Sequence, residues 1–130
     1  MASKRMAWTG RVISILVSLM FVFSASMKLA GGAELEKGLA HLELAGRVPV
    51  IPLTILELSV VAIYLIPATS VLGAILLTGY LGGAILTHWR VGDMFIVHIV
   101  LGMFIWLGIY LREDRLRALI PIRTRVSPLP

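Results

Sequence analysis

Four long apolar stretches, separated by polar segments, account for most of the chain. They cover residues 12–30, 49–66, 71–89 and 94–111. Each is close to the roughly 20 residues that a helix needs to cross a bilayer. The last two connections hold only a few residues, with a proline in one and a glycine and Asp93 in the other, where helices end and begin. We therefore expect an all-α fold: a single-domain four-helix transmembrane bundle, with Asp93 suited to cap its last helix.

The one longer connection, between the first two stretches, has a different pattern. Leu35, Leu39 and Leu42 recur at helical spacing, and charged or polar residues fill most of the positions between them. This pattern predicts a short amphipathic helix that lies on the membrane surface. Gly46 and Pro49 are expected to turn the chain back into the bilayer.

Composition supports a membrane location and excludes one kind of chemistry. Hydrophobic residues make up 58% of the chain, charged residues only 15%, and the mean hydropathy is +0.95. Soluble domains carry about a quarter charged residues, so these values indicate an integral membrane protein. The chain has no cysteine, which excludes a disulfide relay and a thiolate metal site.

Basic residues predict the orientation of the helices. With both termini in the cytoplasm, eight lie inside and four outside. The inside set is Lys4, Arg5, Arg11, Arg112, Arg115, Arg117, Arg123 and Arg125, and the outside set is Lys28, Lys37, Arg47 and Arg90. We expect the basic tail, residues 112–130, to lie against anionic headgroups of the lipid bilayer and not against nucleic acid. A signal peptide is the alternative for the N-terminus, because Ser24-Ala25-Ser26 loosely resembles a cleavage site.

Glu57 is the only charged residue between Val48 and Thr87. An acidic side chain at the centre of a membrane helix costs about 2.5 to 3.5 kcal/mol on insertion scales, so this carboxyl group should be protonated, paired or turned to a polar interior. Intramembrane acids are usually functional, whereas a packing role would use a costly group for a weak effect. Both interpretations stay open.

Other polar residues are expected near the depth of Glu57. Counting 1.5 Å per residue places the end of the first span, the end of the third and the start of the fourth in the same outer half. The ligand-binding candidates are Glu57, Lys28, His88, His98, Tyr80 and Thr87. Either Lys28 or His88 could pair with Glu57. Lys28 could instead reach the interface, and the histidines could be anchors or simply hydrogen-bond the backbone.

No metal site is predicted, and catalytic residues are left unassigned. Glu57 with two histidines offers ligands for zinc or iron, but no short ligand spacing such as HxxxH or ExxH is present. Gly79 and Gly83 form a small-xxx-small pair on the third span. Such pairs let helices approach closely, so we expect helix packing there, within the bundle or between the subunits of a homo-oligomer.

Five short motifs occur in order along the chain: Ser24-Ala25-Ser26-Met27-Lys28-Leu29, Leu56-Glu57-Leu58, the glycine-rich run from Leu72 to Ala84, Thr87-His88-Trp89-Arg90 and Tyr110-Leu111-Arg112. In these motifs the chain resembles the DoxX-like family of small bacterial membrane proteins. This resemblance implies four helices in the bacterial cytoplasmic (inner) membrane. It also implies a link to respiratory or stress-response oxidoreductases, one of which uses a quinone.

Four functions follow as hypotheses. The first is a protein that binds a small amphipathic or quinone-like molecule, or a lipid, in the outer half of the bundle and supports an oxidoreductase partner. The others are a small proton-coupled transporter, a membrane enzyme that uses Glu57 as acid or base, and a structural assembly subunit. The sequence shows no built-in redox cofactor, so electron transfer would need a bound quinone or a partner.

Overall fold

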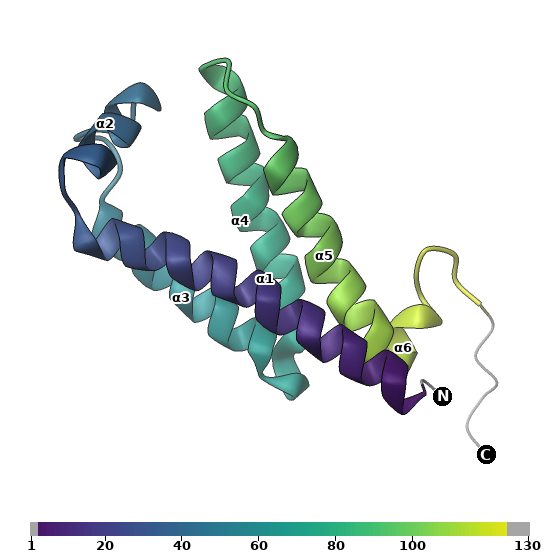
Figure 1. Ribbon diagram of the computed structural model, residues 1–130. Coiled ribbons are helices and arrows are strands. Elements are labelled where there is room, and N and C mark those ends of the chain that lie inside the picture. The colour runs from purple at the N-terminus through teal and green to yellow at the C-terminus, as the bar shows by residue number, and fades with distance from the viewer. Residues whose placement is uncertain (1–2, 125–130) are drawn as a thin grey trace.

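The computed structural model describes residues 3–124, and these form an all-helical structure (Figure 1). The helices are α1 Lys4–Ala30, α2 Ala33–His41, α3 Val50–Leu65, the short 3-10 helix η1 Pro67–Thr69, α4 Ser70–Arg90, α5 Ile96–Arg112 and α6 Asp114–Arg117. The expected all-α class is confirmed.

The four apolar stretches predicted from the sequence correspond to α1, α3, α4 and α5. The bounds of α3, α4 and α5 lie within two residues of those expected, whereas α1 begins eight residues before residue 12. Its early start follows from a cap, because the Ser3 side chain accepts a hydrogen bond from the Met6 backbone N–H. The expected cap at Asp93 was wrong: Phe95 is the N-cap of α5. The amphipathic helix α2 is shorter than the connection in which it lies. Turns over residues 42–48 form the rest of that connection.

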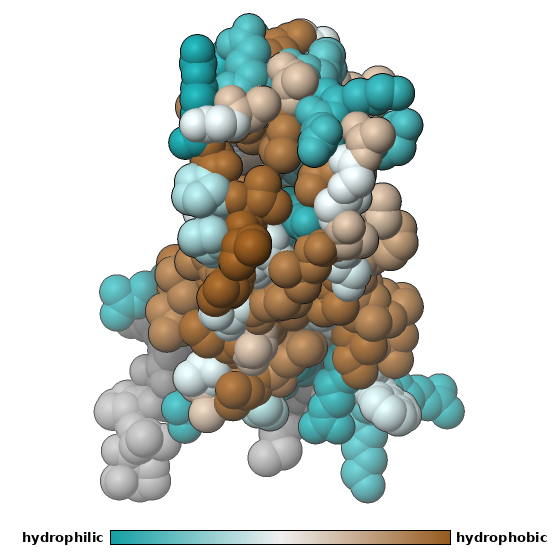
Figure 2. Space-filling view, turned by 90° about the vertical axis from the view of Figure 1, so that its left-hand side faces the viewer, coloured by the Kyte–Doolittle hydropathy of each residue, from teal (hydrophilic) through white to brown (hydrophobic). Residues whose placement is uncertain are grey.

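The four apolar helices are neighbours in a ring. Both α1 and α4 contact α3 on one side and α5 on the other. Two helical stretches, Lys4–Ala30 and Pro67–Arg90, are long and apolar enough to cross a membrane, and α3 and α5 are shorter apolar helices. Figure 2 shows a broad belt of hydrophobic side chains between hydrophilic side chains at both ends of the molecule. Such a belt suits contact with lipid.

Glycines bring the helices together at the end of the molecule where α1 begins and α5 ends (Figure 1). A Cβ added to Gly73 would lie 2.3 Å from backbone atoms of Tyr64, and one added to Gly10 would lie 2.6 Å from the Gly108 carbonyl oxygen. Tyr64 is fully buried between these contacts, and its hydroxyl donates to the Ile105 carbonyl at 2.8 Å. We call this region, Gly10, Tyr64, Gly73, Ile105 and Gly108, the tight end.

The basic tail begins beside the tight end. The Arg112 guanidinium donates to the Tyr64 carbonyl at 3.2 Å, and the Arg117 side chain contacts both Asp114 and the Tyr110 carbonyl. These contacts fold the start of the tail back onto the helix ends. Arg125, another residue of the predicted tail, lies outside the described residues.

Candidate functional site

Lys28 and Glu57 form an ion pair between α1 and α3. Lys28 Nζ lies 2.5 Å from Glu57 Oε2. The Glu57 side chain is 1% exposed and that of Lys28 is 19% exposed, so the carboxylate is buried and the ammonium lies at the edge of the buried region. The sequence left Lys28 and His88 as alternative partners for Glu57, and the structure pairs it with Lys28. The charge of a buried carboxylate on an apolar helix is thereby compensated, as the cost of burying it requires.

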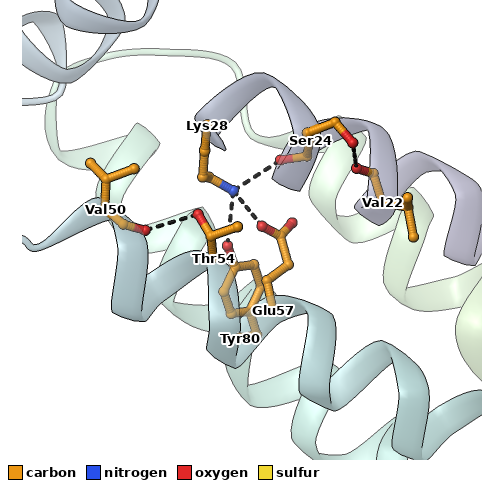
Figure 3. A network of polar contacts seen from close by, with 8 residues as sticks. Val22, Ser24, Lys28, Val50, Thr54, Glu57 and Tyr80 are labelled. Atoms are coloured by element: carbon orange, nitrogen blue, oxygen red, sulfur yellow. Dashed lines mark hydrogen bonds and ion pairs between the residues drawn. The ribbon is translucent and has the colours of Figure 1, made fainter. Parts of the chain in front are cut away.

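Two further oxygens complete the surroundings of the ammonium group. Lys28 Nζ donates to Ser24 Oγ at 3.0 Å, one turn earlier on α1, and to Tyr80 Oη at 3.3 Å on α4 (Figure 3). A lysine ammonium has three N–H donors, so each has an acceptor here. Three helices therefore converge on one charge, and the ion pair is fixed in position.

The ion pair lies in the wall of a cavity of about 520 Å³. The cavity lies between the apolar helices, away from the tight end, and most of its wall is aliphatic or aromatic. All six ligand-binding candidates from the sequence line it: Lys28, Glu57, Tyr80, Thr87, His88 and His98. The structure therefore brings together the residues that depth alone placed at one level. Their role in binding stays a prediction.

The two histidines lie next to each other in the cavity wall. The ring centroids of His88 on α4 and His98 on α5 are 4.7 Å apart with an angle of 33° between the ring planes. His88 Nδ1 lies 3.3 Å from Asp93 Oδ2, in the turn that joins these helices. His88 therefore pairs with Asp93, and not with Glu57.

Polar contacts join the end of α2 and the two residues after it to the end of α4 and the turn after it, beside the cavity. His41 Nε2 lies 2.7 Å from Asp93 Oδ1. Arg90 donates to Glu43 Oε2 at 3.0 Å and to the Leu42 carbonyl at 2.5 Å. We call these contacts, which join His41, Leu42 and Glu43 to Arg90 and Asp93, the latch.

The latch changes the acidity of Asp93. Its pKa is lowered, chiefly because His41 hydrogen-bonds to the carboxylate. Partial desolvation raises the pKa of Asp93 and opposes this effect, whereas the contact with His88 lowers the pKa further. The charged form of Asp93 is therefore the form that holds the two segments together.

Gly79 and Gly83 do not act as helix contacts within the described chain. A Cβ added to either would meet no atom of another helix within 4 Å, so close packing inside the bundle was a wrong expectation at these positions. Gly83 lines the cavity, and Gly79 does not. The glycines of the tight end have the role that the sequence assigned to this pair, and a contact between subunits stays a prediction.

Several residues of the site were not predicted from the sequence. Ser24 had a signal, since it lies four residues before Lys28 and so on the same helix face. The latch had none, because His41 and Asp93 are 52 positions apart and both lie in polar connections. Three residues after α2 also line the cavity: Leu42 was expected to face the membrane surface, and no role was predicted for Leu44 and Val48.

Apolar helices with hydrophilic ends and a buried ion pair define a helical membrane protein with a polar site in its interior. The family model described as "DoxX-like family" matches residues 12–109, and the chain belongs to this family. The resemblance inferred from the sequence motifs is thereby confirmed. No curated protein and no solved structure matches the chain.

Proposed function

We propose that this DoxX-like protein binds a small amphipathic molecule in the cavity, with the polar head of the molecule at Lys28 and Glu57. The observation that carries the proposal is the buried ion pair in the wall of a largely apolar cavity of about 520 Å³. Ligand sites of small molecules have this character: roughly 300 to 1,000 Å³, mostly apolar, with a few fixed polar groups.

The chemistry of the wall supports an uncharged head with hydrogen-bonding oxygens. Lys28 and Glu57 cancel each other in charge, so a charged head would be left with an uncompensated charge in an apolar site. Tyr80 and Thr87 add hydroxyl groups to the same wall. A quinone-like ring carries carbonyl oxygens on an apolar body, and such an oxygen would replace Tyr80 Oη, at 3.3 Å the most distant of the three acceptors of Lys28 Nζ. A lipid with a neutral head is the second candidate ligand. Metal binding is not proposed.

We also propose a position in the membrane. Four helices would span the bacterial cytoplasmic membrane as a multi-pass bundle, with both termini in the cytoplasm and the cavity in the outer half. The distribution of basic residues supports this orientation, as does the placement of the start of α1 and of α6 at the same end of the molecule (Figure 1). A reporter fused at Ala40 tests the orientation, since it should be extracytoplasmic.

Two kinds of partner belong to the proposed function. Family membership supports a membrane or peripheral oxidoreductase, or a stress-response protein, as the partner that uses the bound molecule. Gly79 is exposed on α4 and meets no other helix of the described chain, which supports a homo-oligomer contact along the face of Gly79 and Gly83. Co-purification from native membranes tests both.

The test of binding compares variants that differ in the ion pair. Protein purified from membranes should retain a small molecule that native mass spectrometry detects, and it should bind a short-chain benzoquinone or a neutral lipid probe. The double variant Lys28→Met with Glu57→Gln should lose this binding. Lys37→Met with Glu34→Gln, the same exchange at an exposed pair, is the matched control and should keep it. A wild-type protein that retains nothing and binds neither probe would refute the proposal.

A further inference from the structure

We infer that the segment from Gly31 to Val48 is a lid over the cavity, and that the latch sets how often the cavity opens to the aqueous phase. The inference rests on the proposed function, because it takes the cavity as the place where a ligand binds, and it names the route by which that ligand enters.

The segment forms part of the cavity wall. Leu42, Leu44 and Val48 all line it, on the side that faces away from the tight end. The remaining wall comes from α1, α3, α4 and α5, which the hydrophobic core holds together. In Figure 2 this end of the molecule is hydrophilic on its outside. Movement of the segment would therefore connect the apolar cavity with water and would leave the helices in place.

The segment is only weakly attached to the rest of the protein. No residue of α2 is buried, and none belongs to the hydrophobic core. The polar contacts of the latch join the segment to Arg90 at the end of α4 and to Asp93 in the turn after it. Side chains in these contacts are largely exposed, and contacts of this kind contribute little each. Opening of the lid is thus a low-cost local change of structure.

The backbone of the segment has suitable hinge points at both ends. Gly31 and Gly32 precede α2 with φ of 66° and 102°, and Gly46 follows it with φ of 71°. Glycine tolerates these conformations and also the alternatives with negative φ, so the chain can rearrange there without steric cost. Glu43, which holds Arg90, has φ of 56°, an uncommon value for a residue with a side chain.

One residue connects the lid to the ligand site. His88 lines the cavity and at the same time contacts Asp93, which also holds His41 of the lid. A ligand that touches His88 therefore changes the surroundings of the carboxylate that holds the lid closed. His88 therefore takes part both in the cavity wall and in the contacts that hold the lid.

The test measures access to a single thiol in the cavity. The chain has no cysteine, so Ala84→Cys introduces one thiol into the cavity wall. Protein in lipid vesicles is treated with a polar, uncharged maleimide from the side of the lid, and the rate of labelling is recorded. Arg90→Ala in this background should raise the rate about two- to fivefold, as expected for the loss of exposed contacts of up to ~1 kcal/mol. Glu43→Gln should act in the same direction, and the double variant should exceed Arg90→Ala only slightly.

Three controls make the result specific. Arg47→Ala removes an exposed arginine of the lid that takes no part in the latch, and it should leave the rate unchanged. A thiol introduced by Lys37→Cys, exposed on α2, should be labelled at the same rate in every variant. A lipid-soluble maleimide should label Ala84→Cys equally in all of them.

Equal rates for Ala84→Cys in the latch variants and in the unchanged background would overturn the inference. If Arg90→Ala does not fold, Glu43→Gln decides, since it keeps the bond from Arg90 to the Leu42 carbonyl. Because no ligand is used, failure here is separate from failure of the binding test.

Discussion

The ion pair between Lys28 and Glu57 predicts a large energetic coupling between the two positions. In Lys28→Met the carboxylate loses its ammonium partner while it is only 1% exposed. Removing one partner of a buried pair costs about 3 to 5 kcal/mol, and we expect this variant to lie in that range. In Glu57→Gln the ammonium keeps Ser24 and Tyr80 and is 19% exposed, so we expect a loss of only about 2 to 3 kcal/mol.

The double variant, Lys28→Met with Glu57→Gln, should be more stable than either single variant. Neither charge is then stranded, and replacing a buried pair with neutral groups is often close to neutral. We expect its free energy of unfolding to lie within about 1.5 kcal/mol of the wild type, although the single losses sum to about 5 to 8 kcal/mol. Binding should not recover with stability, because the polar groups that would hold the ligand are gone.

The measurement is reversible unfolding in mixed detergent micelles, followed by circular dichroism. Glu34→Gln and Lys37→Met, at a pair whose side chains are 87% and 75% exposed, serve as control and should each change stability by less than about 0.5 kcal/mol. Independent sites add within about 0.5 kcal/mol. If the losses in the free energy of unfolding of the two single variants at Lys28 and Glu57 add to that of the double variant within this margin, the coupling is refuted.

Further predictions concern the tight end and the latch. Gly73→Ala should cost about 1 to 3 kcal/mol by overpacking against Tyr64, whereas Gly79→Ala, with free space around it, should change stability by no more than about 1 kcal/mol in the favourable direction; thermal unfolding of both separates them. Tyr64→Phe should cost about 1 kcal/mol by loss of its bond to the Ile105 carbonyl, seen in the same assay. Asp93, whose pKa is lowered, should contribute stability in full above the ordinary aspartate pKa of about 3.9 and lose it as the pH falls through its lower native value. Carbon NMR of its carboxyl group measures that value, and a pKa at or above the ordinary one would contradict the latch.

The depth of residues along each helix predicted where the site lies but not which side chains contact each other. Depth along each helix follows from 1.5 Å per residue, which is why Glu57, Lys28 and His88 were expected at one level. Which of them meet depends on how each helix is rotated about its axis, and four stretches that are apolar on nearly every side do not define that rotation. The choice of Lys28 over His88 therefore required the structure.

The glycines also show that a sequence motif does not determine which helices meet. A small-xxx-small pair identifies a face that another helix could approach, but not whether one does. Gly79 and Gly83 have the pattern and no intrachain contact, whereas Gly108 has close contacts and large residues, Phe104 and Arg112, four positions away on either side. Close approach is decided by what lies opposite, here the backbone of Tyr64 and the Gly108 carbonyl, and that information is distant in sequence.

The close contact at the tight end makes one end of α4 a fixed point about which the rest of the helix can rotate. At Gly73 the first turns of α4 are pressed against α3, and the same helix reaches the cavity near its other end, at His88. His88 lies 15 residues, or about 22 Å, along α4 from Gly73, so a rotation of the helix by about 5° about Gly73 displaces His88 by about 2 Å. A single methyl group added at Gly73 is thus expected to alter the width of the cavity about 22 Å away. Affinity for a ligand can therefore be tuned by substitutions that never touch it.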